Sequence, residues 1–312
     1  MTLRSEKKFT SVDGKTQIHV TQWIPENREI TGVVQISHGV SEYGRRYEPV
    51  AEYLCRQGFA VIANDHHGHG GSLIEDRPAV YLGDKNGWWN TVGDLEKLRI
   101  STKKRFPGKP YFMLGHSMGS FLLRSHMIRY PGKADGYILS GTGHLIRPMI
   151  FGGKLVADLE IRRLGRTAYS KLADQLVFGA YNKQFQPNRT DSDWLSANAE
   201  NVDAYLADPL CGGKVTLGLL RDMLGGIDFI TRPENIRKMD KQKPVLFISG
   251  EKDPVGENGK GVKRAAACFK KAGMEKVKVK LYPGLRHEIL NEKEREDILQ
   301  DMLKWMKSNM EK

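Results

Sequence analysis

The sequence lacks several features that would mark a secreted, membrane-spanning or zinc-binding protein. It has only three cysteines, Cys55, Cys211 and Cys268, which form no Cys-x-x-Cys pair, so a structural zinc site is not expected. No apolar run approaches the roughly 18 residues that a membrane-spanning helix needs. Residues 1–15 contain no apolar core of a secretory signal. Together these absences predict free thiols in a reducing compartment, the cytoplasm.

Acidic residues are also in short supply. The chain has 37 Asp and Glu against 49 Lys and Arg, which gives a formal net charge of +12. The basic residues are spread along the chain without a nucleic-acid-binding motif, so no nucleic-acid partner is expected. The charge fits a lysine-rich solvated surface or weak attraction to anionic lipid, and the second alternative predicts a transient membrane-surface contact. The oligomeric state stays open.

The apolar pattern alternates between strand-like and helix-like segments, which favours an α/β fold. Asp13-Gly14 divides the first two strand-like segments and is a strong hairpin signal. The apolar strands that follow have no polar alternation, as expected for a parallel sheet covered by helices on both faces. The predicted strands are 7–13, 15–24, 32–37, 59–64, 110–115, 134–141, 244–250 and 277–284, and the predicted helices are 47–57, 88–106, 118–131, 260–273 and 292–310.

The alternation stops between residues 144 and 239, where the pattern is helical or loop-like and shows no clear buried strand. We therefore expect a core that consists of residues 1–143 and 240–312. Residues 144–239 are expected to form an insertion that folds over the sheet.

A candidate nucleophile follows the strand at 110–115. The segment Gly115-His116-Ser117-Met118-Gly119 matches Gly-x-Ser-x-Gly, with a strand before it and a helix after it. In this context the motif is typical of a nucleophile elbow, where a sharp turn exposes the serine and excludes side chains at both glycines.

A serine hydroxyl needs a base, and the base needs a carboxylate to orient it. His287 is the only histidine in the last third of the chain and follows the last predicted strand. Asp253 follows the strand before it, which gives the chain order Ser, Asp, His. Glu251 is the alternative carboxylate, whereas Asp240 lies at the wrong end of its strand.

Acyl transfer also needs donors for the oxyanion. We expect one to be the N–H of Met118, directly after the serine, and the other to come from the loop after the strand at 32–37. In that loop His38-Gly39 allows a close backbone approach, and Val40 N–H is the expected second donor.

Taken together, the segments HGVSEYGRRY, DHHGHGGS, GHSMGS, DPL, SGEKDPVG and GLRHEIL resemble the monoacylglycerol lipase and lysophospholipase-like branch of the α/β-hydrolase superfamily, with its serine aminopeptidase-type hydrolases. The resemblance covers nearly the whole chain in the right order. It implies an α/β-hydrolase fold, in which residues 144–239 form a helical cap. It also implies ester hydrolysis through an acyl-enzyme, without a metal or organic cofactor.

The resemblance identifies the substrate less specifically than it identifies the fold. A small-molecule ester with an acyl chain, such as a monoacylglycerol or lysophospholipid, is the first expectation. Short-chain, aryl or feruloyl esters come second, and a peptide bond after an N-terminal residue third. The alternative from another class is a non-catalytic binding protein of the same fold.

The stretch NDHHGHGGSL, residues 64–73, contains three histidines and raises the question of a metal site. Neighbouring side chains such as His66 and His67 point to opposite sides of an extended chain, which disfavours a shared metal. The resemblance implies instead a structural loop near the oxyanion loop, in which His69 contributes packing. His67 stands where the family often has arginine.

Overall fold

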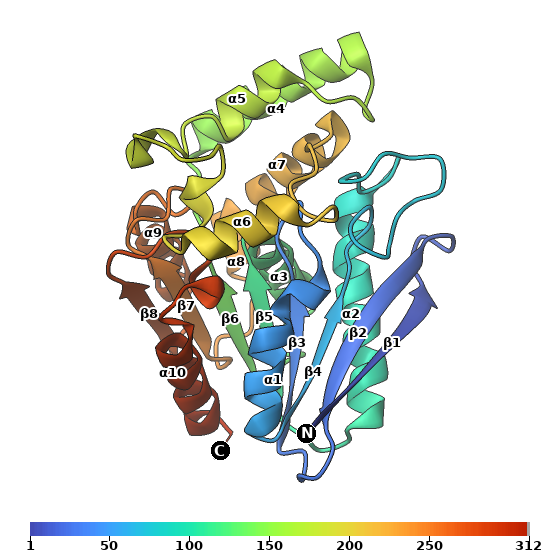
Figure 1. Cartoon of the computed structure of the whole chain (residues 1–312), viewed down its shortest axis with the longest axis vertical. Helices are drawn as coiled ribbons and strands as arrows, with labels where there is room; N and C mark the ends of the chain where they lie inside the picture. The colour runs from blue at the N-terminus through green and yellow to red at the C-terminus, as the bar shows by residue number, and fades with distance from the viewer. Residues whose placement is uncertain (311–312) are drawn as a thin grey trace.

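The computed structural model describes residues 1–310. One eight-stranded sheet runs through the molecule in the order β1-β2-β4-β3-β5-β6-β7-β8 (Figure 1). β1 pairs antiparallel with β2 and β2 antiparallel with β4, whereas all other pairs are parallel. The strands are β1 (Thr2–Thr10), β2 (Gln17–Pro25), β3 (Gly32–Ser37), β4 (Phe59–Asn64), β5 (Tyr111–His116), β6 (Gly136–Ser140), β7 (Val245–Gly250) and β8 (Val277–Tyr282).

Helices cover both faces of this sheet. α1 and α10 contribute to the apolar core on one face, and α2, α3 and α9 to the core on the other. Every residue of β3, β4, β5, β6 and β7 is buried, which explains their continuous apolar sequence. The helices are α1 (Glu48–Arg56), α2 (Gly87–Arg105), α3 (Met118–Arg129), α9 (Lys260–Lys271) and α10 (Arg295–Ser308).

The strands and helices agree closely with the sequence pattern except at the first strand. β1 begins at Thr2 and ends at Thr10, whereas the pattern predicted 7–13. Most of its side chains are exposed because it is the sheet edge, so apolar alternation does not mark its start. The hairpin at Asp13-Gly14 is confirmed, with Gly14 at a φ of +77°.

Helices replace strands between β6 and β7. α6 crosses the carboxyl ends of the strands, and α4 and α5 lie above it, farthest from the sheet (Figure 1). Within residues 1–310, no helix is long and apolar enough to cross a membrane. The helices of this segment are α4 (Arg147–Leu164), α5 (Lys171–Val177), α6 (Ala199–Ala207), α7 (Leu217–Thr231) and α8 (Pro233–Ile236).

Candidate active site

Ser117 lies in a sharp turn between β5 and α3. Its φ and ψ are 51° and −122°, a conformation that residues with a side chain rarely adopt. A Cβ at Gly119 would lie 2.0 Å from the Ser37 carbonyl oxygen, and a Cβ at Gly115 would lie 2.6 Å from the Gly119 carbonyl oxygen. The turn therefore needs both glycines of the Gly-x-Ser-x-Gly motif.

His287 and Asp253 lie in loops after β8 and β7. His287 Nδ1–H donates to Asp253 Oδ1 over 3.0 Å, and both side chains are buried. Ser249 Oγ and the Val255 N–H also donate to the Asp253 carboxylate, at 3.0 and 2.9 Å. The alternative carboxylate, Glu251, is exposed. The structure thus brings Asp253 to His287.

The surroundings of His287 adjust its protonation. Burial lowers the pKa of His287, but the Asp253 carboxylate, together with Glu288 and Glu42, leaves this pKa above its ordinary value. Burial raises the pKa of Asp253, but the His287 charge and several hydrogen bonds bring it below its ordinary value. Burial and the His287 charge lower the pKa of His116 to about 4, so His116 is neutral at pH 7.

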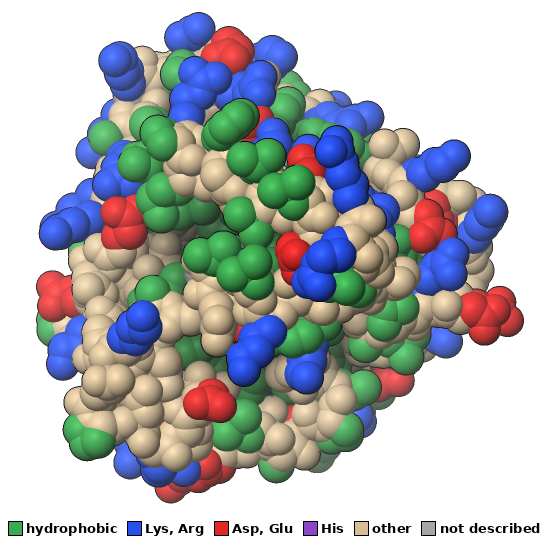
Figure 2. Space-filling model, turned by 90° about the horizontal axis from the view of Figure 1, so that it is seen from above, with side chains coloured by type: hydrophobic (Ala, Val, Ile, Leu, Met, Phe, Trp, Pro, Cys, Tyr) green, Lys and Arg blue, Asp and Glu red, His purple; other side chains and the backbone are tan. Residues whose placement is uncertain are grey.

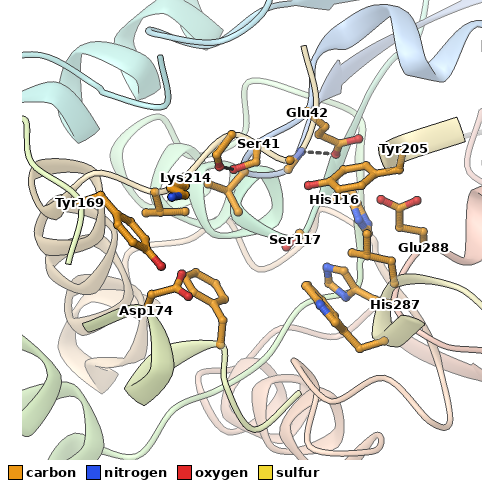
Figure 3. Close-up of a pocket in the computed structure, with 18 residues that line it drawn as sticks. Ser41, Glu42, His116, Ser117, Tyr169, Asp174, Tyr205, Lys214, His287 and Glu288 are labelled. Atoms are coloured by element: carbon orange, nitrogen blue, oxygen red, sulfur yellow. Dashed lines mark hydrogen bonds between the residues drawn. The ribbon is translucent and has the colours of Figure 1, made fainter. Parts of the chain in front are cut away.

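Ser117 and His287 line the same cavity (Figure 3). A Cβ at Gly141 would lie 2.9 Å from His287 Cε1 and 3.0 Å from His116 Cε1, so glycine there leaves room for both rings. Within residues 1–310, Ser117 Oγ makes no direct hydrogen bond to His287. A bond between nucleophile and base often tightens only when substrate binds.

The loop after β3 passes close to Ser117. A Cβ at Gly39 would lie 3.2 Å from Ser117 Cβ. The Gly39 N–H donates to Glu42 Oε1 over 2.5 Å. Among the described residues, neither the Val40 N–H nor the Met118 N–H donates to a protein acceptor. Met118 is the first residue of α3, where a helix supplies no acceptor for the N–H.

The histidine-rich loop packs against the loop after β3. His38 Nε2 accepts from the His66 N–H over 2.9 Å, and His66 Nε2–H donates to the His38 carbonyl oxygen over 3.2 Å. Their ring centroids are 4.0 Å apart. Burial lowers the pKa of His38 to about 4 and that of His69 to about 3, so both imidazoles are neutral at pH 7. The loop therefore supports the backbone beside Ser117.

His67 contacts a different part of the fold. Its Nε2–H donates to Asp94 Oδ2 over 2.7 Å, and both side chains are buried. Ser11 Oγ and the Val12 N–H donate to the same carboxylate, each at 2.8 Å. His67 thus joins its loop to α2 and to the β1–β2 hairpin. Over residues 1–310, no group of three or more His, Cys, Asp or Glu residues is arranged to hold a metal ion.

Two cavities meet at Ser117. The first has a volume of about 240 Å³ and is largely polar, with Glu42, Tyr205 and Glu288 on the side of His287 and Tyr169, Asp174 and Lys214 across from them (Figure 3). The second has a volume of about 60 Å³ and is largely apolar. Its apolar lining includes Phe121, Leu145, Met223, Leu224 and Ile227.

The sequence did not single out three charged residues beside this site. Glu42 and Glu288 are buried and pair with the nearly buried Arg46, which is separated from Glu288 by 242 positions. Glu42 and Arg46 belong to the quoted segment HGVSEYGRRY, which was the only signal for them. Trp194 was missed as well, and its ring centroid lies 5.2 Å from that of His287.

Comparison with known proteins places the chain among hydrolases. Residues 28–294 match the family described as serine aminopeptidase, S33. The chain is 31% identical to a monoacylglycerol lipase of Mycolicibacterium smegmatis, with 98% of both chains covered. It is 28% identical to human monoglyceride lipase, with 83% of this chain and 76% of the human protein covered.

Among solved structures, a thermostable carboxyl esterase from Bacillus coagulans in complex with glycerol superposes with a TM-score of 0.91. The identity is 28%, and the superposition covers 98% of this chain and 99% of the esterase. The family match spans most of the chain, and the M. smegmatis relative aligns over nearly all of it. The chain belongs to the serine aminopeptidase S33 family of the α/β-hydrolase superfamily.

Proposed function

We propose that the protein is a serine hydrolase that cleaves carboxylic esters of lipids, with monoacylglycerols as the first substrate class. The observation that carries this proposal is the meeting of a polar and an apolar cavity at Ser117, beside the hydrogen-bonded pair of His287 and Asp253. The alignment with monoacylglycerol lipases over most of the chain supports it.

In this proposal Ser117 Oγ attacks the ester carbonyl while His287 Nε2 accepts its proton. The N–H groups of Val40 and Met118 bind the oxyanion, and such donors typically contribute about 3 kcal/mol each to the transition state. His287 then protonates the leaving alcohol. Water, deprotonated by His287, hydrolyses the acyl-enzyme, and Asp253 orients the imidazole and stabilises its charged form.

The two cavities suggest how the substrate is oriented. An acyl chain gains free energy in an apolar cavity, whereas a glycerol moiety needs hydrogen-bonding partners. We therefore assign the acyl chain to the cavity lined by Phe121, Met223 and Leu224, and the alcohol to the polar cavity.

Residues 144–239 are proposed to act as a cap over this site, and one part of the cap exposes an unusual number of apolar side chains. We call residues 146–176, which include α4 and most of α5, the overhanging arm. Phe151 is 72% exposed and Leu176 is 62% exposed. The other exposed apolar residues of the arm are Ile146, Met149, Leu155, Leu159, Leu164 and Leu172.

This arm supports the proposal of a transient contact with a membrane surface. It carries six Lys or Arg against three Asp or Glu. Viewed from above, hydrophobic side chains gather among basic ones (Figure 2). An amphipathic helix with a basic rim binds at the lipid interface through apolar burial and attraction to anionic headgroups. A cytoplasmic location of the protein stays a prediction from the sequence.

A short-chain or aryl esterase is the second candidate. The apolar cavity, at about 60 Å³, is smaller than the polar cavity of about 240 Å³, which favours a short acyl group. Rates on monoacylglycerols and p-nitrophenyl esters of rising chain length separate the two candidates. A maximum at medium or long chains supports the lipid substrate, whereas a maximum at acetyl contradicts it.

A further assay addresses the headgroup. Hydrolysis of a lysophospholipid and of a monoacylglycerol with the same acyl chain is compared at low and high salt. We expect the neutral monoacylglycerol to be the better substrate at both. A lysophospholipid that is preferred at low salt and loses its preference at high salt would assign the substrate to the lysophospholipid class instead.

A further inference from the structure

A buried ionic cluster lies between the loop after β3 and the loop that carries His287. Arg46 donates from Nη1 and Nη2 to the two carboxylate oxygens of Glu288, both at 2.9 Å. The same guanidinium donates to Glu42 Oε2 over 2.8 Å. Glu42 and Glu288 are 3% and 4% exposed, so the cluster is largely shielded from water.

Glu42 connects this cluster to the loop after β3. Its second oxygen, Oε1, accepts from the Gly39 N–H over 2.5 Å and from the Tyr47 hydroxyl over 2.8 Å. A Cβ at Gly39 would lie 3.2 Å from Ser117 Cβ, closer than ordinary van der Waals contact. The position of Val40, the next residue along the loop, therefore depends on the carboxylate of Glu42.

Glu288 connects the cluster to His287 and to α6. It directly follows His287, and its own N–H donates to the Leu195 carbonyl oxygen over 2.7 Å. Asn201 of α6 donates from Nδ2 to Glu288 Oε2 over 2.8 Å, while its Oδ1 accepts from Arg46 over 3.3 Å. One guanidinium thus contacts side chains from three segments that are far apart in the sequence.

We propose that Arg46, Glu42 and Glu288 are positioning residues, which fix the Val40 oxyanion donor and His287 relative to each other, and that Asn201 fastens the cap to this cluster. The inference rests on the proposed function, because it assigns roles around the Ser117 reaction. A buried ion pair is weak evidence for stability, since desolvation offsets much of the Coulomb attraction. Its planar, bidentate geometry, however, imposes a defined arrangement on its partners.

The cluster also contributes charge near His287. Two carboxylates and one guanidinium leave a net negative charge, which favours the imidazolium. The titratable side chains that face His287 are Asp253 after β7, His116 at the end of β5, Glu42 after β3 and Glu288 of its own loop. Around these partners, Tyr47 and Tyr205 face Glu42, Arg46 and Glu288, and Tyr181 faces Asp253. The geometric and electrostatic roles can be separated by two substitutions.

Arg46→Lys keeps the positive charge but removes the planar guanidinium that donates to several acceptors at once. A lysine ammonium is a point charge and cannot hold Glu42, both Glu288 oxygens and Asn201 at once. We expect kcat for p-nitrophenyl butyrate to fall about 10- to 100-fold, because small displacements of reacting groups have effects of this size. KM and the pH midpoint of kcat/KM should change little.

Glu288→Gln keeps the shape but removes one negative charge. The pH midpoint of kcat/KM should move to lower pH, because His287 loses a carboxylate that favours its protonated form. Loss of stability alone would lower the melting temperature without moving this midpoint. Arg232→Met is the matched control, since Arg232 forms an exposed pair with Asp228 away from the site, and its kinetics should equal those of the wild type.

Wild type and Ser117→Ala are measured in the same series. If wild type hydrolyses the ester and Ser117→Ala does not, the proposed function stands and the variants test the cluster alone. Wild-type kcat in folded Arg46→Lys would overturn the positioning role, and an unmoved midpoint in Glu288→Gln would overturn the contribution of its charge to His287. If Arg46→Lys does not fold, kcat of Glu288→Gln decides, because its amide cannot accept both guanidinium N–H bonds. An unchanged kcat would then overturn the positioning role. An inactive wild type would contradict the proposed function.

Discussion

Two parts of the helical segment over the sheet differ in charge, in exposed apolar surface and in the elements that hold them. The overhanging arm is basic, and eight of its apolar side chains are exposed. Residues 192–207, which include α6 and which we call the docked segment, contain three Asp or Glu and no Lys or Arg. Polar groups tie the docked segment to the loop that carries His287.

The docked segment makes these ties mostly through its backbone. Glu292 accepts from the N–H groups of Ala197 and Asn198 at 2.8 and 2.9 Å. Arg286 donates to the carbonyl oxygens of Asp193 and Ser196. Buried N–H and C=O groups without such partners would be costly, so this segment is fixed in one place.

The overhanging arm contacts α7 through backbone hydrogen bonds and through ion pairs. The Leu217 and Gly218 N–H groups donate to the Ala168 and Arg166 carbonyl oxygens at 2.8 and 2.7 Å. Lys154 pairs with Asp228 at 3.2 Å, and Asp158 pairs with Arg221 at 2.6 Å. These pairs are partly exposed, and such pairs typically contribute about 1 kcal/mol or less. This difference supports the proposal that the docked segment encloses His287 while the overhanging arm contacts lipid.

The largest expected effect is the loss of activity in Asp253→Asn, which does not depend on either part of the helical segment. Asp253→Asn removes the carboxylate that orients His287, and loss of a triad carboxylate typically lowers kcat about 10⁴-fold. The decrease should be equal for a water-soluble ester and for a vesicle-borne monoacylglycerol, because the reaction itself is impaired. A loss seen only with vesicles would show that Asp253 does not act on the chemistry.

The second substitution removes contacts that hold the docked segment. Glu292→Ala leaves the N–H groups of Ala197 and Asn198 without an acceptor. We expect kcat/KM for both kinds of substrate to fall up to about 100-fold as the His287 loop shifts. Glu29→Ala, which removes an exposed pair with Lys109, is the control. Undiminished activity of the folded Glu292→Ala protein would contradict a docked role.

The third set of substitutions makes the overhanging arm less apolar. Phe151→Ser, Leu155→Ser and Leu159→Ser together remove an apolar stripe along α4. Vesicle binding, measured by co-sedimentation, should fall about tenfold or more, since burying one such side chain contributes about 1.5–3 kcal/mol. Hydrolysis of p-nitrophenyl butyrate should stay unchanged.

Leu3→Ser is the control for the arm, because the exposure of Leu3 lies within the range of the three arm residues but Leu3 lies on β1, at the sheet edge. If Leu3→Ser weakens vesicle binding as much as the triple change does, the arm is not the lipid contact. If the triple change lowers p-nitrophenyl butyrate hydrolysis as well, the two parts are not separate in function.

The smallest effect concerns pH. The proposed base must be neutral to accept the serine proton. Burial lowers the pKa of His287, but the carboxylates of Asp253, Glu288 and Glu42 together keep it above its ordinary value. The rate on a soluble ester should therefore rise with pH and reach half its maximum above about pH 6.5, the usual histidine value. The same midpoint is expected for the triple arm variant. A rate independent of pH between about 5 and 8 would exclude His287 as the base.

Much of the site could be predicted from the sequence because its constraints are local. The turn at Ser117 needs glycine on both sides, so it appears in the sequence as a short motif between a predicted strand and a predicted helix. The order of the chain then led to Asp253 and His287, which the structure joins at 3.0 Å. Glu251 was a real alternative in the sequence, and only the fold shows that it points to solvent.

The rest depended on contacts between distant residues. The pairing of Arg46 with Glu288 and of His67 with Asp94 follows from how loops and helices pack, which periodicity does not encode. The interrupted strand pattern predicted that residues 144–239 form an insertion. The division of this segment into a docked and an overhanging part depends on Glu288 and Glu292, which lie near the C-terminal end of the chain.

The central claim is that Ser117 is the nucleophile, and covalent labelling tests it most directly. Wild type and Ser117→Ala are treated with a fluorescent fluorophosphonate, and the modified peptide is identified by mass spectrometry. Wild type should gain one label, on Ser117, with a rate that rises with pH, and Ser117→Ala should gain none. A folded wild type that stays unlabelled, or a label on another residue that persists in Ser117→Ala, would contradict the claim.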